Sequence, residues 1–285
     1  MASRVVREKS KFEFLAIFLK WFYLIFFLCL TLLPLVWLFI TSFKTNLEFE
    51  TASAFALPAK WQFSNYVNAI NMSGLPRLFL NSTMVAVSAT ALNLIVSAMG
   101  AFAIAREKFK FNNLLLTIIM SGVLIPIIAL MVPYFRLIKN LNLIDNIGGL
   151  IIVYAAINLP ISVYLIHGFM STIPTELEEA AVIDGCSFAQ RFTKVIFPLS
   201  QAGLATAGVL GFIYSWNEFT YAMLLTNSEK ARTLQLGIRY FKSQFVVDYT
   251  SMLAAIVITM LPTILVYIFM HDQIIGGMTN GAVKG

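Results

Sequence analysis

Six apolar blocks, each long enough to cross a membrane, constrain the fold of this chain more than any other feature. An α-helix rises about 1.5 Å per residue, so about 20 apolar residues are needed to cross a hydrocarbon core of about 30 Å. We therefore predict six membrane-spanning helices, over residues 21–40, 83–105, 114–135, 150–166, 204–225 and 252–270.

The composition supports a membrane protein and excludes two other classes. Of the 285 residues, 59% are apolar and 12% are charged, whereas soluble domains are about 25% charged. Too little polar surface remains to cover a water-soluble globule, and a disordered chain needs low hydrophobicity and high net charge. Because the strands of a membrane barrel alternate in polarity over about 10 residues, the predicted class is an all-α membrane protein.

The residue types that usually carry catalysis or bind metals are scarce. Cys29 lies in an apolar block and Cys186 in a polar segment, while His167 and His271 each stand alone at the end of a predicted span. We therefore predict no catalytic residue, no metal site and no disulfide in this chain.

Basic residues predict the orientation, because cytoplasmic loops carry an excess of Lys and Arg. They gather in the first twenty residues and in the short loop after the second span, as Arg4, Arg7, Lys9, Lys11, Lys20, Arg106, Lys108 and Lys110. Six spans place both segments on one side, so both termini and the loop between spans four and five are predicted to be cytoplasmic. The loops 41–78, 138–149 and 226–251 are then external. This placement of basic residues accounts for the net charge of +6. We therefore predict no nucleic-acid partner.

Small and polar residues recur every fourth position in two of the predicted spans. They are Ala89, Asn93, Ser97, Ala101 and Ala105 in the second span, and Gly203, Ala207, Gly211 and Ser215 in the fifth. Such stripes allow helices to approach closely in lipid. Either they pack against neighbouring helices, or they line a transport path or a seam between subunits.

Glu218 is the one acidic residue inside a predicted span. A carboxylate within a membrane is costly and usually faces the protein interior or water. Two interpretations follow: Glu218 holds a neighbouring helix or an unwound turn by hydrogen bonds, or it lines the substrate path together with Asn217.

The loop 171–200 is predicted to form two short helices outside the membrane. Thr172 is a candidate cap for the first helix, Pro174 suits its first turn, and Gly185 is a natural stop. The second helix is expected over residues 188–196, ending before Pro198. The physical pattern indicates an interfacial element or a knob that docks on a partner.

The same loop resembles the EAA motif found in the permease subunits of ABC importers. Glu179-Ala180-Ala181 is followed by Gly185 and, after nine intervening residues, by Val195-Ile196-Phe197-Pro198. This resemblance implies a type I ABC importer permease fold, with six transmembrane helices and a cytoplasmic coupling helix that docks on an ATP-binding subunit. The residues that it assigns to coupling are Glu178, Glu179, Ala180, Ala181, Asp184 and Gly185.

Other segments resemble the carbohydrate branch of that family, specifically the maltose-type second permease. They are residues 61–66, residues 215–219 and the glycine-rich end 276–285. In that branch the outer loop, here 226–248, reaches into a sugar-binding protein, so Arg239, Tyr240 and Phe241 are expected to contact it. The C-terminal tail, 271–285, is expected to be extended and to insert between the two ATP-binding subunits.

The function implied by the resemblance is import of a sugar, expected to be an oligosaccharide, by ATP-driven alternating access. The transmembrane domain, 21–270, would sit in the inner or plasma membrane of a prokaryote, in contact with lipid. Its implied partners are a second homologous permease, two ATP-binding subunits, an extracytoplasmic sugar-binding protein and the sugar. No phosphate-binding Gly-x-x-x-x-Gly-Lys-Ser/Thr motif occurs, so ATP and Mg are expected on the partner and this chain is not predicted to be an enzyme.

Two alternatives remain open at this point. The first is the same permease role with glycerol phosphate or an acidic oligosaccharide as the substrate. An ion-coupled secondary transporter or channel subunit is the alternative from another class, and it would predict ionisable residues at the membrane midplane and internal repeats.

Overall fold

The computed structural model describes residues 11–72, 74–107, 110–237 and 248–282, which form helices joined by turns. The chain divides into two compact units. The first comprises Met1–Ala69 with Gln244–Val257, and the second comprises Ile70–Ser243 with Ile258–Gly285. Each unit is described separately below.

The first unit begins with helix α1 (Lys11–Thr41), which contains the first predicted span. Most of its apolar side chains are exposed, and those of Phe22, Ile25 and Phe26 are more than half exposed. A helix that is apolar on all sides and exposed in this way is suited to lipid or to another membrane subunit.

The chain leaving α1 folds into a compact connection. The Phe43 ring packs against Trp61, Phe63 and Tyr66, with ring centroids 4.9–5.2 Å apart. Helix α2 (Asn46–Thr51) is fixed by a capping box between Thr45 and Glu48, and α3 (Ser64–Met72) follows. The segment 61–66 therefore packs as a structural element against the end of α1.

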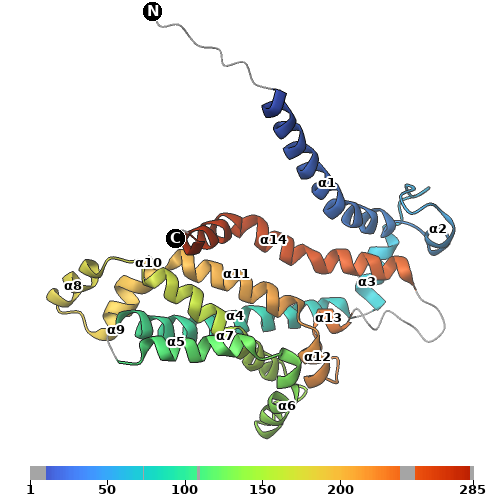
Figure 1. The fold of residues 1–285 in the computed structure, drawn as a ribbon. Coiled ribbons are helices and arrows are strands. Elements are labelled where there is room, and N and C mark those ends of the chain that lie inside the picture. The colour runs from blue at the N-terminus through green and yellow to red at the C-terminus, as the bar shows by residue number, and fades with distance from the viewer. Residues whose placement is uncertain (1–10, 73, 108–109, 238–247, 283–285) are drawn as a thin grey trace, which may run out of the picture. The chain divides into compact units, whose positions relative to one another are not determined.

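The core of the second unit consists of three long helices that pack against one another (Figure 1). They are α4 (Leu75–Arg106), α7 (Ile147–Met170) and α11 (Gln201–Asn217). Asn93, Ser97 and Ala101 of one predicted stripe are buried, as are Ala207 and Ser215 of the other. This confirms the packing interpretation of the small-residue stripes.

The third predicted span is broken in the structure. Helix α5 (Asn112–Ser121) runs into the short turns η1 (Gly122–Leu124) and η2 (Ile127–Leu130), and α6 (Met131–Asn140) follows. The two halves meet at an angle of 96°. The break lies at Pro126, which supplies no backbone N–H and forces Ile125 into an extended conformation.

The fifth predicted span also ends early. Helix α11 stops at Asn217, Glu218 adopts an extended conformation, and the short helix α12 (Thr220–Leu225) follows. The four-residue helix α13 (Leu234–Gly237) lies farther along the same loop. Among the described residues, four helices are long and apolar enough to cross a membrane, or up to six if each bent pair is one span.

The last helix, α14 (Tyr249–Ala282), is longer than the predicted sixth span. It continues through most of the predicted C-terminal tail, so the expectation of an extended tail was wrong. Glycine lowers helix stability by about 1 kcal/mol per residue without blocking the backbone hydrogen bond. No proline follows Pro262, so no residue of the tail removes a backbone hydrogen bond from the helix.

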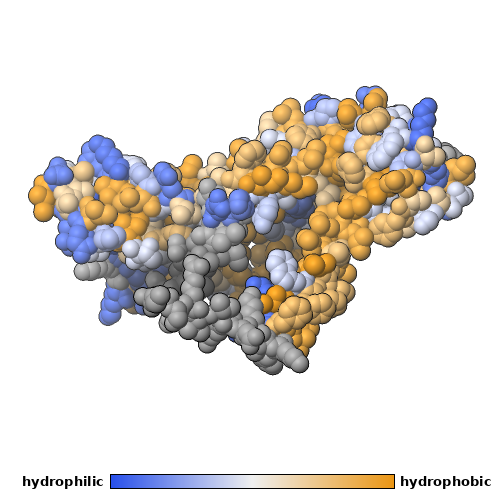
Figure 2. Space-filling model, turned by 90° about the horizontal axis from the view of Figure 1, so that it is seen from above, coloured by the Kyte–Doolittle hydropathy of each residue, from blue (hydrophilic) through white to orange (hydrophobic). Residues whose placement is uncertain are grey.

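Apolar side chains cover broad areas of the surface, as one face shows in Figure 2. In the second unit they include Leu92, Ile95 and Met99 on α4. A water-soluble monomer rarely exposes apolar patches of this extent. The surface is therefore suited to contact with lipid.

Gly203 provides a test of the packing between α11 and α7. A Cβ atom at this position would lie 2.7 Å from the Cβ and Cγ atoms of Phe169, whereas one at Gly168 on α7 would have no atom within 4 Å. We expect Gly203→Ala to destabilise the purified protein by about 1–3 kcal/mol through overpacking. The matched change Gly168→Ala should be neutral or stabilising, as measured by thermal unfolding in detergent. Equal melting temperatures for the two variants would contradict this packing.

Candidate functional site

The segment 171–200, called the hairpin below, projects from one end of the three-helix core (Figure 1). Its first arm is helix α8 (Thr175–Ile183), with Glu176 and Glu178 in the first turn. Carboxylates at this end of a helix interact favourably with the helix dipole and stabilise the helix. Gly185 has a φ of +81°, a conformation that glycine adopts without strain. The predicted stop at Gly185 is therefore confirmed.

The second arm begins at Ser187, which forms a capping box with Gln190. Helix α9 (Phe188–Gln190) continues into a π-helical turn, η3 (Arg191–Ile196), and then into α10 (Phe197–Leu199). The prediction that this arm ends before Pro198 was wrong. Proline is tolerated in the first turn of a helix, and the widened turn makes Pro198 the second residue of α10.

The predicted cap of α8 also differs in the structure. Thr172 donates its hydroxyl hydrogen bond to the carbonyl oxygen of Phe169 at the end of α7, over 2.7 Å. Pro174 precedes α8 and offers no side-chain acceptor. Thr172 therefore belongs to the end of α7, two residues too early to cap α8.

The residues predicted to couple to an ATPase lie on two opposite faces of the hairpin. Glu179, Ala180, Asp184 and Gly185 are exposed. Sequence reasoning did not include Ile183 among them, although its side chain is 85% exposed at the tip of α8. Spacing identifies it, because positions 179, 180 and 183 share one helical face.

Glu178 and Ala181 face the other way and are buried. The Glu178 carboxylate pairs with Arg191 at 2.7 Å and with Arg106, the last residue of α4, at 3.7 Å. The oxygens of Glu178 thus face arginines of its own chain, and its role in coupling to an ATPase stays a prediction. The arginines were missed because one is 72 positions away, and helical spacing carries no information on such a contact.

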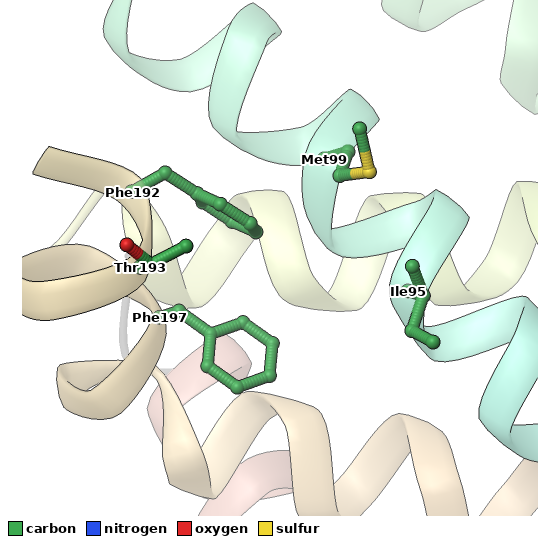
Figure 3. A pocket seen from close by; sticks show the side chains of 5 residues that line it. All are labelled: Ile95, Met99, Phe192, Thr193 and Phe197. Carbon is green, nitrogen blue, oxygen red and sulfur yellow. The ribbon is translucent and has the colours of Figure 1, made fainter. Parts of the chain in front are cut away.

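The hairpin and α4 also form an apolar hollow, shown in Figure 3. Phe192 and Phe197 of the second arm line it, opposite Ile95 and Met99 of α4. Phe102, one turn farther along α4, stacks against Phe192 with centroids 5.1 Å apart. Aromatic side chains therefore attach the second arm to the core.

Glu218 is buried at the break between α11 and α12. Its carboxylate accepts a hydrogen bond from the Tyr154 hydroxyl of α7 over 2.6 Å, and others from the backbone N–H groups of Tyr221 and Ala222. These are the bonds expected of a carboxylate that holds an unwound turn and a neighbouring helix. Asn217, by contrast, is exposed, and its side chain bonds Ile213 and Gln235.

Tyr221 extends this polar cluster to the broken third span. Its hydroxyl donates to the carbonyl oxygen of Ile127 in η2 over 2.8 Å, and its ring packs edge-on against Tyr134 of α6 at 5.6 Å. The break at Glu218 and the break at Pro126 are thus joined through one side chain.

The predicted contacts with a sugar-binding protein, Arg239, Tyr240 and Phe241, lie outside the described residues. The part of the loop before them is anchored to the core. Asp145 accepts hydrogen bonds from the backbone N–H groups of Asn227 and Ser228, both over 2.8 Å. These N–H donors lower the pKa of the Asp145 carboxyl.

This anchor should depend on pH. Because the folded-state pKa of Asp145 is lowered, its stabilising contribution is fully present above the ordinary aspartate value of about 4 and is lost as pH falls through the lowered value. We expect amide-exchange protection at Asn227 and Ser228, corrected for intrinsic rates, to be constant from neutral pH to about pH 4 and to fall below it. In Asp145→Asn, protection should be weaker and independent of pH. A pH dependence that survives in this variant would contradict the assignment.

The fold and the hairpin define a class, a polytopic helical membrane protein with a two-armed hairpin at one end of the helical core. The model of the binding-protein-dependent transport system inner membrane component family matches residues 93–275. The chain belongs to this family, whose members are the non-catalytic permease subunits of ABC transporters.

Individual relatives agree with this membership. The chain is 39% identical over 270 residues to an ABC transporter permease protein of Caldicellulosiruptor sp., covering 93% of this chain and 97% of the relative. It is 33% identical to SmoH, the sulfoquinovosyl glycerol transport system permease protein of Agrobacterium fabrum, with 89% of each chain covered. A bacterial ABC transporter that imports the acidic polysaccharide alginate has the same fold, with a TM-score of 0.83, 24% identity and coverage of 93% of this chain and 98% of that one.

Proposed function

We propose that this chain is a membrane subunit of an ATP-driven importer that brings a sugar, and within that class an oligosaccharide, into a prokaryotic cell. The observation that carries the proposal is the exposed face of α8. Glu179, Ala180 and Ile183 face away from the core although two of the three are apolar. A short helix that presents such a face fits docking into a groove of another subunit.

The orientation in the proposal places the hairpin and both termini in the cytoplasm. The basic residues of the first twenty positions and of the loop after α4 support it. ATP and Mg would then be bound by two copies of a partner subunit. These copies would lie beneath this chain and beneath a second, homologous permease. Closure of that ATPase pair would push α8 and switch the membrane helices between inward- and outward-facing states.

The sugar substrate is supported by two similarities. A relative transports sulfoquinovosyl glycerol by its name, and the chain shares its fold with a transporter of alginate. Large polar solutes need a path with exposed polar groups, and Asn217 at the break after α11 offers one. Glu218 is less suited to bind a solute in this path, because its oxygens already accept hydrogen bonds from Tyr154 and Tyr221.

The external loop supports delivery by a binding protein. The anchor at Asp145 fixes the start of this loop at Asn227 and Ser228. The proposed contacts with the binding protein are Arg239, Tyr240 and Phe241, farther along the same loop. Basic and aromatic side chains suit contacts with a protein or a sugar. The family itself is described by its dependence on a binding protein.

Co-purification tests this proposal. The tagged chain should be isolated from its native membrane with a second permease, two copies of an ATP-binding subunit and, after mild cross-linking, an extracytoplasmic binding protein. Mass spectrometry of the ligand released from that binding protein should then identify an oligosaccharide. If the released ligand is glycerol phosphate or an acidic oligosaccharide instead, the role as an importer subunit stands and the alternative substrate replaces the proposed one. Isolation of the chain without any ATP-binding subunit would contradict the proposal.

A further inference from the structure

Four charged side chains form a compact cluster where the hairpin meets the end of α4. Arg191 of the second arm bridges two carboxylates, Glu178 at 2.7 Å and Glu107 at 3.0 Å. Arg106 approaches the second oxygen of Glu178 at 3.7 Å. The Arg106 and Glu178 side chains are only 4% and 9% exposed.

Arg106 also fixes the base of the hairpin. Its guanidinium donates hydrogen bonds to the backbone carbonyl oxygens of Met170, the last residue of α7, and of Ile173. One side chain therefore connects the ends of two core helices with the carboxylate of α8. A buried charge that makes several charge-assisted bonds in fixed geometry strongly restricts the elements that it joins.

The two arms of the hairpin are held by different means. The second arm is packed through Phe188 and Phe192 against Phe102, at 5.0 and 5.1 Å. On α8, by contrast, Val182 and Ile183 are 52% and 85% exposed and make little apolar contact with the core. The position of α8 therefore depends chiefly on Glu178 and on Ala181, the buried residue one turn farther along the helix.

We propose that Arg106 and Arg191 are positioning residues that clamp α8, through Glu178, to the ends of α4 and α7. The clamp makes the hairpin and the core helices move as one body, so that a push on the exposed face of α8 reaches the membrane helices. This inference rests on the proposed function, in which α8 is the docking surface. In addition, the buried face of α8 would transmit the movement of α8 to α4 and α7.

The test compares Glu178→Gln with Lys194→Gln in the assembled complex with its partner permease and ATP-binding subunits. Lys194 is exposed on the second arm, so its variant removes one charge from the hairpin and leaves the clamp intact. We expect Glu178→Gln to raise amide exchange in residues 175–183 and to lower the sugar transported per ATP hydrolysed by about tenfold, within the usual range of coupling between sites. Lys194→Gln should change neither quantity.

A double-mutant cycle keeps the inference testable if the cluster also affects assembly. Arg191→Gln and Glu178→Gln should each lower the transport-to-ATP ratio. The double variant should lose clearly less than the sum of the two single losses, because both single variants remove the same contact between Glu178 and Arg191. Additive losses, or unchanged exchange and coupling in Glu178→Gln, would overturn the clamp. Failure of the proposed function has a different result: Ala180→Arg on the exposed face would leave association with the ATP-binding subunit unchanged.

Discussion

Glu218→Ala should destabilise the protein by about 3–5 kcal/mol, because a buried hydrogen-bond donor left without its acceptor costs about 1–3 kcal/mol and three donors lose theirs. The substitution leaves the Tyr154 hydroxyl and the Tyr221 and Ala222 N–H groups without the carboxylate that accepts their hydrogen bonds. It also releases α12 from α7. Thermal unfolding of the purified protein in detergent should show a melting temperature lower by roughly 10 °C.

The matched control at this site is Glu218→Gln, which keeps a carbonyl oxygen for one or two of the three donors. We expect it to cost about 1–2 kcal/mol. Tyr154→Phe should cost a similar amount, since it removes only the hydroxyl. If Glu218→Ala melts at the same temperature as the original protein, the break at this residue is held by something other than its hydrogen bonds.

Ala180→Arg should weaken association with the ATP-binding subunit by about 100-fold, the loss of roughly 3 kcal/mol typical of a central contact in an interface. Ala180 lies on the exposed face of α8 between Glu179 and Ile183, where a long charged side chain would hold the groove of a partner away. Transport should fall by at least as much. The measurement is the dissociation constant of the purified ATP-binding subunit on membranes that contain the variant.

Ala189→Arg is the control, because Ala189 is exposed on the other arm of the hairpin. Its variant adds the same side chain to the same element without touching the proposed docking face. Equal weakening in both variants would indicate that any added charge disturbs the hairpin. An unchanged dissociation constant in Ala180→Arg would remove α8 as the docking surface.

Much of the helical architecture was predictable because lipid imposes a length on every apolar block. Gly185 was predicted as a stop, and its positive φ confirms the physical reason. Packing was one of two interpretations of the stripe containing Asn93 and Ala101, and both residues are buried. These features follow from local rules of length, conformation and size.

The breaks and the long-range contacts were not predictable by those rules. Pro126 lies at the break in the third span, but a bend of 96° depends on what the freed backbone groups contact. Glu178 looked like its neighbour Glu179 in sequence, and only the placement of Arg106 and Arg191 distinguishes them. Which face of a short helix turns inward is decided by residues far away in the chain.

Reconstituted transport tests the central claim most directly. The chain, its second permease and the ATP-binding subunits would be placed in liposomes, with the binding protein and its labelled sugar outside and nucleotide inside. The account predicts uptake that requires both the binding protein and ATP, and that stops when a non-hydrolysable ATP analogue replaces ATP. Uptake that proceeds without ATP and follows an imposed ion gradient would contradict it and indicate a secondary transporter.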